Sequence, residues 1–205
     1  MAMPLPDTGI ADTGTASGRQ RITDAAAELF LRNGYAQTTL RDIASAVGIK
    51  AGSIYYHFES KEALLLDILQ RGIVAMEHAF DQAAAATSGE LPSARIRAHI
   101  RGHLSALFEH GPYTANHVSA FHVAPAAVRE AVIPDRDRYE RRWTDLLEEL
   151  QVEGDMAPDV PVALSRLALF GAMNFAVEWF DSERGNLDEL VEVIARQYWE
   201  GVAAR

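Results

Sequence analysis

The segment TLRDIASAVGIKAGSIYYHF, residues 39–58, decides the fold of the first part of the chain. Thr39 with Asp42 three positions later is typical of a helix start, where the hydroxyl and the carboxylate cap each other's backbone N–H groups. Ala44 is small enough to lie where two helices cross, and Gly48 permits the left-handed backbone of a tight turn. An inward aliphatic face is supplied by Ile43, Val47, Ile49 and Ile54. The pattern predicts two short helices joined by a tight turn.

The second of these helices carries small, hydroxyl-bearing and aromatic side chains in place of charged ones, namely Gly52, Ser53, Tyr55, Tyr56 and His57. Glycine lets a backbone approach a groove, and the other groups can donate to phosphates or touch base edges. The alternative is that Tyr55, Tyr56 and Phe58 pack the interior of a small domain. Because neighbouring helical residues point about 100° apart, at least one tyrosine is expected at the surface.

Lys61 follows Ser60, which is expected to cap a long helix. A cation in the first turn opposes the helix dipole, at a cost of roughly a few tenths of a kcal/mol. This placement is explained if the helix end faces phosphate. It is equally explained by a solvated lysine whose charge is offset by Glu62, and the sequence leaves both explanations open.

The longer segment TTLRDIASAVGIKAGSIYYHFESKEAL resembles the DNA-binding signature of TetR-family repressors, and the similarity covers about residues 19–66. The resemblance implies a homodimer that binds a palindromic operator, with one recognition helix in each of two successive major grooves. It further implies phosphate contacts from Thr39, Tyr56, His57 and Lys61, and base contacts from Gly52 and Tyr55 with Ser53 nearby. The full set of expected DNA-contacting residues is Thr39, Arg41, Lys50, Ala51, Gly52, Ser53, Tyr55, Tyr56, His57 and Lys61.

Ala51 departs from the family pattern, since many members carry a base-reading polar or basic residue there. Lys50 is a candidate substitute, and DNA shape and backbone contacts are then expected to contribute more of the specificity.

Composition is compatible with DNA binding. The net charge is -10, but residues 1–61 hold six basic and six acidic side chains, so all the excess acid follows residue 61. The chain has no cysteine, which excludes disulfides, thiolate metal sites and cysteine nucleophiles. The start of the chain lacks a basic, apolar leader, and no apolar stretch is long enough to span a bilayer. We therefore expect a soluble cytoplasmic protein with no membrane partner and no cofactor.

The chain divides into three parts. Residues 1–18 are rich in small and polar residues and are expected to be a disordered tail. Residues 19–66 form the three-helix DNA-binding domain, and residues 67–205 form a larger helical domain for ligand binding and dimerisation. Helical spacing recurs throughout, with a kink or break expected near Pro134, and no alternating strand pattern is present. The predicted fold is all-α, with about nine helices.

The helix expected from Val162 to Phe180 is apolar nearly all round, so both of its sides need cover. A core helix in a monomer would satisfy this, but two operator half-sites need two reading heads, which favours a dimer built with the last helix. The expected dimer residues are Leu167, Phe175, Trp179, Leu190, Ile194 and Tyr198.

Aromatic and polar groups of the second domain are candidates for lining an effector cavity, although core packing is the simpler role for each taken singly. They are Phe80, His103, Phe108, His117, Phe121, His122, Tyr139, Trp143, Phe170 and Asn174. Asn174 lies in an apolar run, where burial without a partner costs about 1–3 kcal/mol, so it bonds across the dimer or reaches into a cavity. The segment FGAMNFAVEWF, residues 170–180, resembles family members that control fatty-acid, steroid or aromatic-acid catabolism, often through CoA thioesters. This implies an acyl-CoA or another hydrophobic or aromatic acid derivative as effector.

Other interpretations of the chain are weaker. His99 and His103 are spaced as two metal ligands would be, but no third ligand is dictated, so no metal site is expected. Arg136, Arg138, Arg141 and Arg142 alternate with acids, which indicates a salt-bridged helix face more than an anion grip. A helical enzyme around His117–His122 lacks any nucleophile or phosphate-loop motif. The remaining alternative is a DNA-binding protein that acts without an effector.

Overall fold

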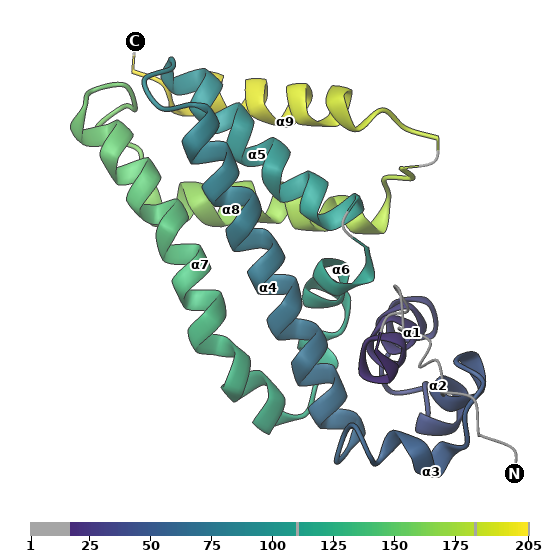
Figure 1. The fold of residues 1–205 in the computed structure, drawn as a ribbon. Helices are drawn as coiled ribbons and strands as arrows, with labels where there is room; N and C mark the ends of the chain where they lie inside the picture. Colours follow the sequence, from purple (N-terminus) through teal and green to yellow (C-terminus); the bar gives the residue numbers. More distant parts are fainter. Residues whose placement is uncertain (1–16, 110, 183, 205) are drawn as a thin grey trace, which may run out of the picture.

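The computed structural model describes residues 17–109, 111–182 and 184–204. In these ranges the chain forms helices and loops and no β-strand, which confirms the expected all-α class (Figure 1). Each described helix is too short or too polar to cross a bilayer. The nine α-helices of the described part are α1 (Gly18–Asn33), α2 (Leu40–Ala46), α3 (Ala51–Ile54), α4 (Lys61–Ala86), α5 (Pro92–Phe108), α6 (Pro112–Ser119), α7 (Ala126–Val152), α8 (Val162–Phe175) and α9 (Leu187–Val202). Two 3-10 turns, η1 (Phe121–Val123) and η2 (Ala176–Glu178), follow α6 and α8.

Helices α1, α2 and α3 form a small head at the start of α4 (Figure 1). The buried core residues of the head are Ile22, Ala26, Phe30, Ile43, Ala44, Ile54 and Phe58. The same apolar cluster continues into α4 through Leu64 and Leu65, and into α7 through Val128 and Val132. The head therefore packs directly on the rest of the molecule.

Local capping fixes where the head helices begin and end. The Asp42 backbone N–H donates to Thr39 Oγ1 at 3.2 Å and the Thr39 N–H donates to Asp42 Oδ2 at 2.8 Å, which is the predicted capping box. Gly48 has φ +72° in the turn after α2, as the left-handed turn requires. Ser60 Oγ accepts from the Ala63 N–H at 3.1 Å and starts α4.

Helices α4 to α9 form the body, which has its own apolar core. Its largest fully buried members include Ile96, Ile100, Leu104 and Trp143. Helix α4 runs from the head to the far end of the body, where α8 and α9 cross the long helices (Figure 1). A movement of α4 or of its neighbours would therefore reach the head.

Three expected boundaries differ from the structure. Helix α3 ends at Ile54, so Tyr55, Tyr56 and His57 lie in the turn that follows. Helix α7 continues through Pro134 without a break, because buried Val132 and Tyr139 anchor the helix on both sides of the proline. Helix α8 ends at Phe175 and tightens into η2 before Phe180.

The expected tail lies almost wholly outside the described residues. Of residues 1–18, only Ser17 and Gly18 are described, as the N-cap and first residue of α1.

Candidate nucleic-acid interface and ligand cavity

The turn after α3 presents two adjacent aromatic side chains to the surface. Tyr56 is 89% exposed and Tyr55 is 62% exposed, so the prediction that at least one tyrosine would be at the surface is confirmed. Phe58, by contrast, is buried in the head core, as its alternative role required. Gly52 and Ser53 are exposed beside the tyrosines, and Ala51 is half-buried. These residues form one surface at the outer end of the head.

This surface rests on an ordered scaffold. Ile43, Ala44 and Ile54 are buried beneath it. The Ile49 N–H donates to Ala44 O at 3.0 Å, and Arg21 Nη2 donates to Val47 O at 2.9 Å, which together hold the turn between α2 and α3. Exposed side chains on a fixed turn are suited to docking in a groove.

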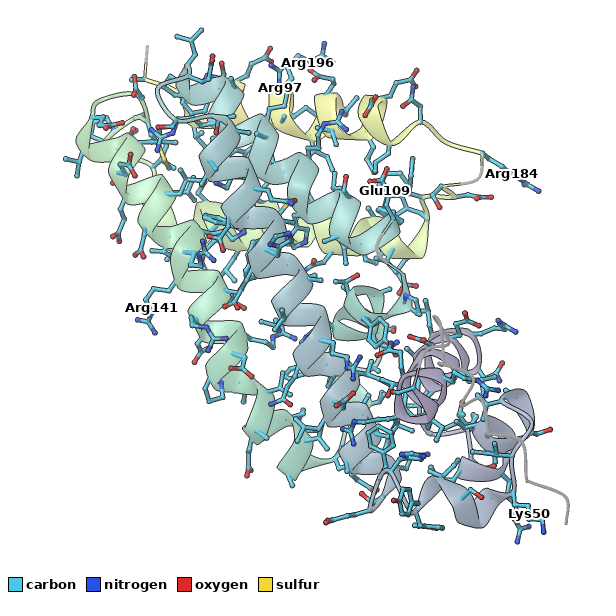
Figure 2. All side chains as sticks on the ribbon, viewed as in Figure 1. Lys50, Arg97, Glu109, Arg141, Arg184 and Arg196 are labelled. Carbon is cyan, nitrogen blue, oxygen red and sulfur yellow. The ribbon has the colours of Figure 1, made fainter. Side chains whose placement is uncertain are left out.

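Two cations of the head, Arg41 and Lys50, are exposed beside this surface. Figure 2 shows Lys50 extending away from the ribbon at the outer end of the head. Arg19, in contrast, is held against the rest of the molecule, since it pairs with Asp67 at 2.7 Å and lies 4.1 Å above the Phe58 ring. Arg41 and Lys50 are thus the head cations best placed to meet phosphate.

Lys61 makes contacts inside the head that the sequence did not predict. Its ammonium donates to Tyr35 O at 2.8 Å and to Thr38 O at 2.9 Å, and it lies 4.2 Å above the Tyr35 ring. The loop between α1 and α2 has carbonyl groups that no helix satisfies, and the lysine supplies their donor. In this geometry Lys61 closes the head internally, and its predicted phosphate contact stays a prediction.

Thr39 and His57 are also occupied within the head. The Thr39 hydroxyl donates to Asp42 Oδ2 at 2.7 Å while it caps α2. His57 is half-buried, its carbonyl accepts from Arg19 Nη1 at 2.8 Å, and its ring meets that of Tyr56 edge to face. Both residues help to position the surface, Thr39 is itself exposed, and their phosphate contacts stay predictions.

A small cavity of about 40 Å³ lies between α4, α5, α6, α7 and α8. It is lined by Ile73, Met76, His103, His117, Val118, Arg136, Tyr139, Glu140, Phe170 and Asn174. Five of the ten predicted ligand residues therefore line one cavity: His103, His117, Tyr139, Phe170 and Asn174.

A hydrogen-bond relay crosses this cavity wall. His103 Nδ1 lies 2.9 Å from Tyr139 Oη, and His103 Nε2 lies 2.9 Å from Asn174 Oδ1. An amide oxygen only accepts, so Nε2 carries the proton and Nδ1 accepts from the tyrosine. Burial lowers the pKa of His103 to about 4, so the ring is neutral at pH 7. Asn174 thus reaches into a cavity, which is one of its two predicted roles.

The other five predicted ligand residues lie elsewhere. Phe80 and Trp143 pack against each other in the body core, with ring centroids 5.6 Å apart. Phe108 packs edge-on against Phe180 outside the cavity, and His122 is exposed on η1. Phe121 lies beneath the Arg136 guanidinium, behind the cavity wall. Phe80 also lines a separate, open cavity of about 620 Å³ with His99 and Arg142, and Phe108 lines another of about 540 Å³.

His99 and His103, the pair with metal-ligand spacing, are engaged with other groups of the described chain. His103 uses both ring nitrogens in the relay, and His99 Nδ1 bonds to Arg95 O at 2.8 Å. His99 Nε2 has no hydrogen-bond partner among the described residues, but His103 has no ring nitrogen left for a metal ion, so this geometry does not favour a metal site on the pair.

Arg136 is a cavity residue that the sequence grouped with Arg138, Arg141 and Arg142 on a salt-bridged helix face. The expected salt-bridged face exists, because Arg138 pairs with Glu77 and Asp135, and Arg142 pairs with Asp81. Arg141 extends away from α7 into solvent (Figure 2). Arg136 shares a helix face with Val132, Tyr139 and Trp143, at positions i-4, i+3 and i+7, and this buried stripe is the signal that could have identified it.

The chain matches two family models that together span most of its length. Residues 22–68 match the model for bacterial regulatory proteins of the tetR family, and residues 89–204 match the tetracyclin repressor-like C-terminal domain. The chain belongs to the TetR family. It is accordingly a DNA-binding transcriptional regulator and not an enzyme.

Individual TetR-family proteins are similar to this chain over most of its length. The HTH-type transcriptional repressor KstR2 of Rhodococcus jostii (strain RHA1) is 32% identical over 196 residues, covering 91% of this chain and 90% of that protein. The ketosteroid transcriptional regulator KstR2 of Mycobacterium tuberculosis has the same fold, with a TM-score of 0.79 at 22% identity over 94% of this chain and 98% of that one. AibR in complex with isovaleryl coenzyme A and operator DNA gives a TM-score of 0.75 at 18% identity over 87% of this chain and 96% of that one.

The TetR-family body also carries an exposed apolar face on its last helices. Phe175 is 65% exposed, Trp179 58% and Leu167 54%, in agreement with their predicted place at an outer face. Leu190 and Ile194 are instead packed inside the protomer, because α9 turns its apolar stripe toward α5 and α8. Tyr198 is half-buried and its hydroxyl lies 2.8 Å from Ser165 Oγ. The outer face is therefore built mainly by α8 and the segment around η2.

Proposed function

We propose that this TetR-family regulator represses its target genes as a homodimer bound to a palindromic operator, and that a small-molecule effector releases it. The observation that carries the proposal is the pair of exposed tyrosines beside Gly52 on a buried, capped helix-turn-helix. Curated relatives that cover most of the chain are transcriptional repressors, which supports repression as the mode of action.

Dimerisation follows from the apolar face formed by Leu164, Leu167, Phe175 and Trp179. Large apolar side chains that gather on one face of a soluble protein usually mark an interface. A second copy of the chain is the natural cover, because a two-fold interface uses the same patch on both partners. Such a dimer presents two reading heads, as a palindromic site requires.

DNA contact is assigned to the outer surface of the head. Tyr55, Gly52 and Ser53 face base edges in the proposal, and Tyr56, Arg41 and Lys50 meet the phosphates on either side. The two cations provide the salt-dependent part of the affinity.

Release by an effector is supported by the way α6 joins the cavity to the head. His117 and Val118 of α6 line the cavity. On the same helix, Asn116 Nδ2 donates to Ala27 O of α1 at 2.9 Å. A ligand that prefers a shifted α6 therefore also prefers a shifted head, and the separation of the two heads changes. We take an acyl-CoA or another hydrophobic acid derivative as the effector class, because much of the cavity lining is apolar and the fold is shared with a protein solved with isovaleryl coenzyme A and operator DNA.

A gel-shift assay with the DNA upstream of the gene tests the proposal. The wild-type chain should shift this DNA and not an unrelated fragment, and Tyr56→Ala should weaken the shift at least tenfold. Val152→Ala, an equally exposed site at the far end of α7, serves as the matched control and should bind as the wild type does. Loss of the shift on adding isovaleryl-CoA, octanoyl-CoA or the corresponding acids supports effector release. A shift that no effector changes would favour an effector-independent DNA-binding protein, and absence of any specific shift would refute the proposal.

A further inference from the structure

The two charged residues of the cavity between α4 and α8 differ in their ion pairs. Arg136 and Glu140 both line it, but Glu140 pairs with Arg166 of α8. Arg136 makes no ion pair within the described part of the chain, and its Nη1 is buried without a hydrogen-bond partner. The guanidinium lies 4.1 Å above the ring of Phe121. Glu140 is thus committed to Arg166, and the carboxylates that act on Arg136, Glu140 and Asp137, do so from beyond ion-pair distance.

The histidines of the cavity do not add to this charge. Burial lowers the pKa of both His103 and His117 to about 4, so both rings are neutral at pH 7. The His117 ring donates from Nε2 to Leu69 O. The only positive charge among the lining residues is therefore that of Arg136, and a half-buried guanidinium with no direct ion pair gains from an anion beside it.

The polar groups that remain open are two donors and one acceptor, the buried Nδ1 of His117. His103 occupies the Asn174 oxygen, which leaves the amide NH₂ of Asn174 for the cavity. Arg136 Nη1 is a second donor. Ile73, Met76, Val118 and Phe170 make the rest of the lining apolar. The cavity is thus matched to a group that accepts hydrogen bonds, carries one negative charge and continues into a hydrocarbon.

We propose that the effector is a free organic carboxylic acid whose carboxylate enters this cavity, with Arg136 as its counter-ion and Asn174 as a second donor. The inference rests on the proposed function, since it names the ligand class of the same site. The open space of about 40 Å³ holds roughly three water-sized groups, which is the size of one carboxylate. A thioester carbonyl is neutral and would leave Arg136 uncompensated, and a CoA phosphate carries more charge and more volume than this site accommodates.

Calorimetric titration of the full-length chain without DNA tests the proposal. The probes are 3-phenylpropanoate with its neutral isostere 3-phenylpropanamide, and octanoate with octanoyl-CoA. Each acid should bind the wild type at least tenfold more tightly than its neutral or thioester counterpart. Arg136→Gln should lose at least tenfold in affinity for the acids, while Arg136→Lys, which keeps the charge, should lose less. Arg138→Gln is the matched control, since Arg138 lies on the same helix but pairs with Glu77 at the surface.

Equal binding of acid and amide would overturn the proposal, as would wild-type affinity in Arg136→Gln with an unchanged melting temperature. Failure of the wild type to bind either acid would also overturn it. Tight octanoyl-CoA binding that is insensitive to Arg136→Gln would assign the site to the thioester instead. None of these results depends on DNA, so the gel shift of the unliganded wild type judges the proposed function separately.

Discussion

Replacing Lys61 with Met tests whether this lysine serves the head itself or the DNA. Met keeps the aliphatic stem beside the Tyr35 ring and deletes the ammonium that bonds to Tyr35 O and Thr38 O at 2.8 and 2.9 Å. If these bonds hold the loop between α1 and α2, their loss destabilises the fold. Lys50→Met is the matched control, because Lys50 is exposed at the outer end of the head.

The expected loss of stability in Lys61→Met is about 2 kcal/mol. A hydrogen bond from a charged group contributes about 1.5–3 kcal/mol to stability. Because Lys61 is only half-buried and water can reach the freed carbonyls, we expect the loss of both bonds together to cost about as much as one such bond. Removal of the cation above the Tyr35 ring adds about 0.5 kcal/mol. Removing a cation from the first turn of α4 returns roughly a few tenths of a kcal/mol. For a chain of this size, this corresponds to a melting temperature about 4–8 °C lower.

Thermal unfolding and the salt dependence of operator binding separate the two roles. Lys61→Met should lower the melting temperature and leave the slope of log K against log salt close to the wild-type value. Lys50→Met should keep the melting temperature and make the slope shallower by about 0.9 for each phosphate that the protein no longer neutralises. If Lys61→Met melted as the wild type does and reduced the slope as Lys50→Met does, the internal role of Lys61 would be refuted.

Three further outcomes are expected. The free energy of unfolding should decline as pH falls from 6.5 to 4, because His103 and His117 stay neutral in the fold with pKa values of about 4, whereas both protonate near pH 6.5 in the unfolded chain. Each histidine contributes a slope of about 1.4 kcal/mol per pH unit. Urea unfolding of His103→Gln at pH 7, 6 and 5 should show a shallower decline than the wild type. Gly72→Ala should lower the free energy of unfolding by about 1–3 kcal/mol, since the added Cβ would lie 2.7 Å from Tyr113 O. Gly201→Ala, whose Cβ would have no atom within 4 Å, should instead stabilise α9 by about 0.5 kcal/mol in the same assay. Trp179→Glu should halve the mass measured by light scattering, and Val152→Glu should not; a monomeric wild type would contradict the dimer.

The features that the sequence predicts well are local. The capping box of Thr39 and Asp42 and the left-handed turn at Gly48 involve groups within a few residues, so residue type and spacing suffice to define them. The end of α3 at Ile54 was not predicted, because the following aromatic residues continue a helical pattern while the chain turns toward the Ser60 cap. Here tertiary packing overrides local periodicity.

The cavity could be predicted only in part, because its members come from distant segments. His103 bonds to Tyr139, 36 residues away, and to Asn174, 71 residues away. Periodicity shows which helix faces are apolar but not which polar groups meet between them. Arg136 and Arg138 look alike in an alternating charged run, yet they lie about 200° apart around α7, so one is at the cavity and the other at the surface.

The contacts of α6 make Tyr113 the residue whose change should separate ligand binding from release. Its hydroxyl donates to Asp24 and lies 3.0 Å from Gln20 Nε2, both on α1, while His117 and Val118 of the same helix line the cavity. Tyr113→Phe removes the hydroxyl and keeps the ring, so the cavity itself is unchanged. Effector affinity without DNA should therefore stay within about twofold of the wild type, well below the effect of a typical coupling free energy.

The concentration of effector that releases the operator should nevertheless rise in Tyr113→Phe, because a looser link transmits less of the binding free energy to the head. Coupling between two sites is typically about 1–3 kcal/mol, so loss of even half of it corresponds to a several-fold shift. Calorimetry and gel shifts on the same preparation measure the two quantities. If affinity and release changed by the same factor, the hydroxyl would act on the cavity and α6 would not be the link. If neither changed, the signal would pass through the Asn116 contact of α6 or through α4 and α7, which also connect the cavity to the head core.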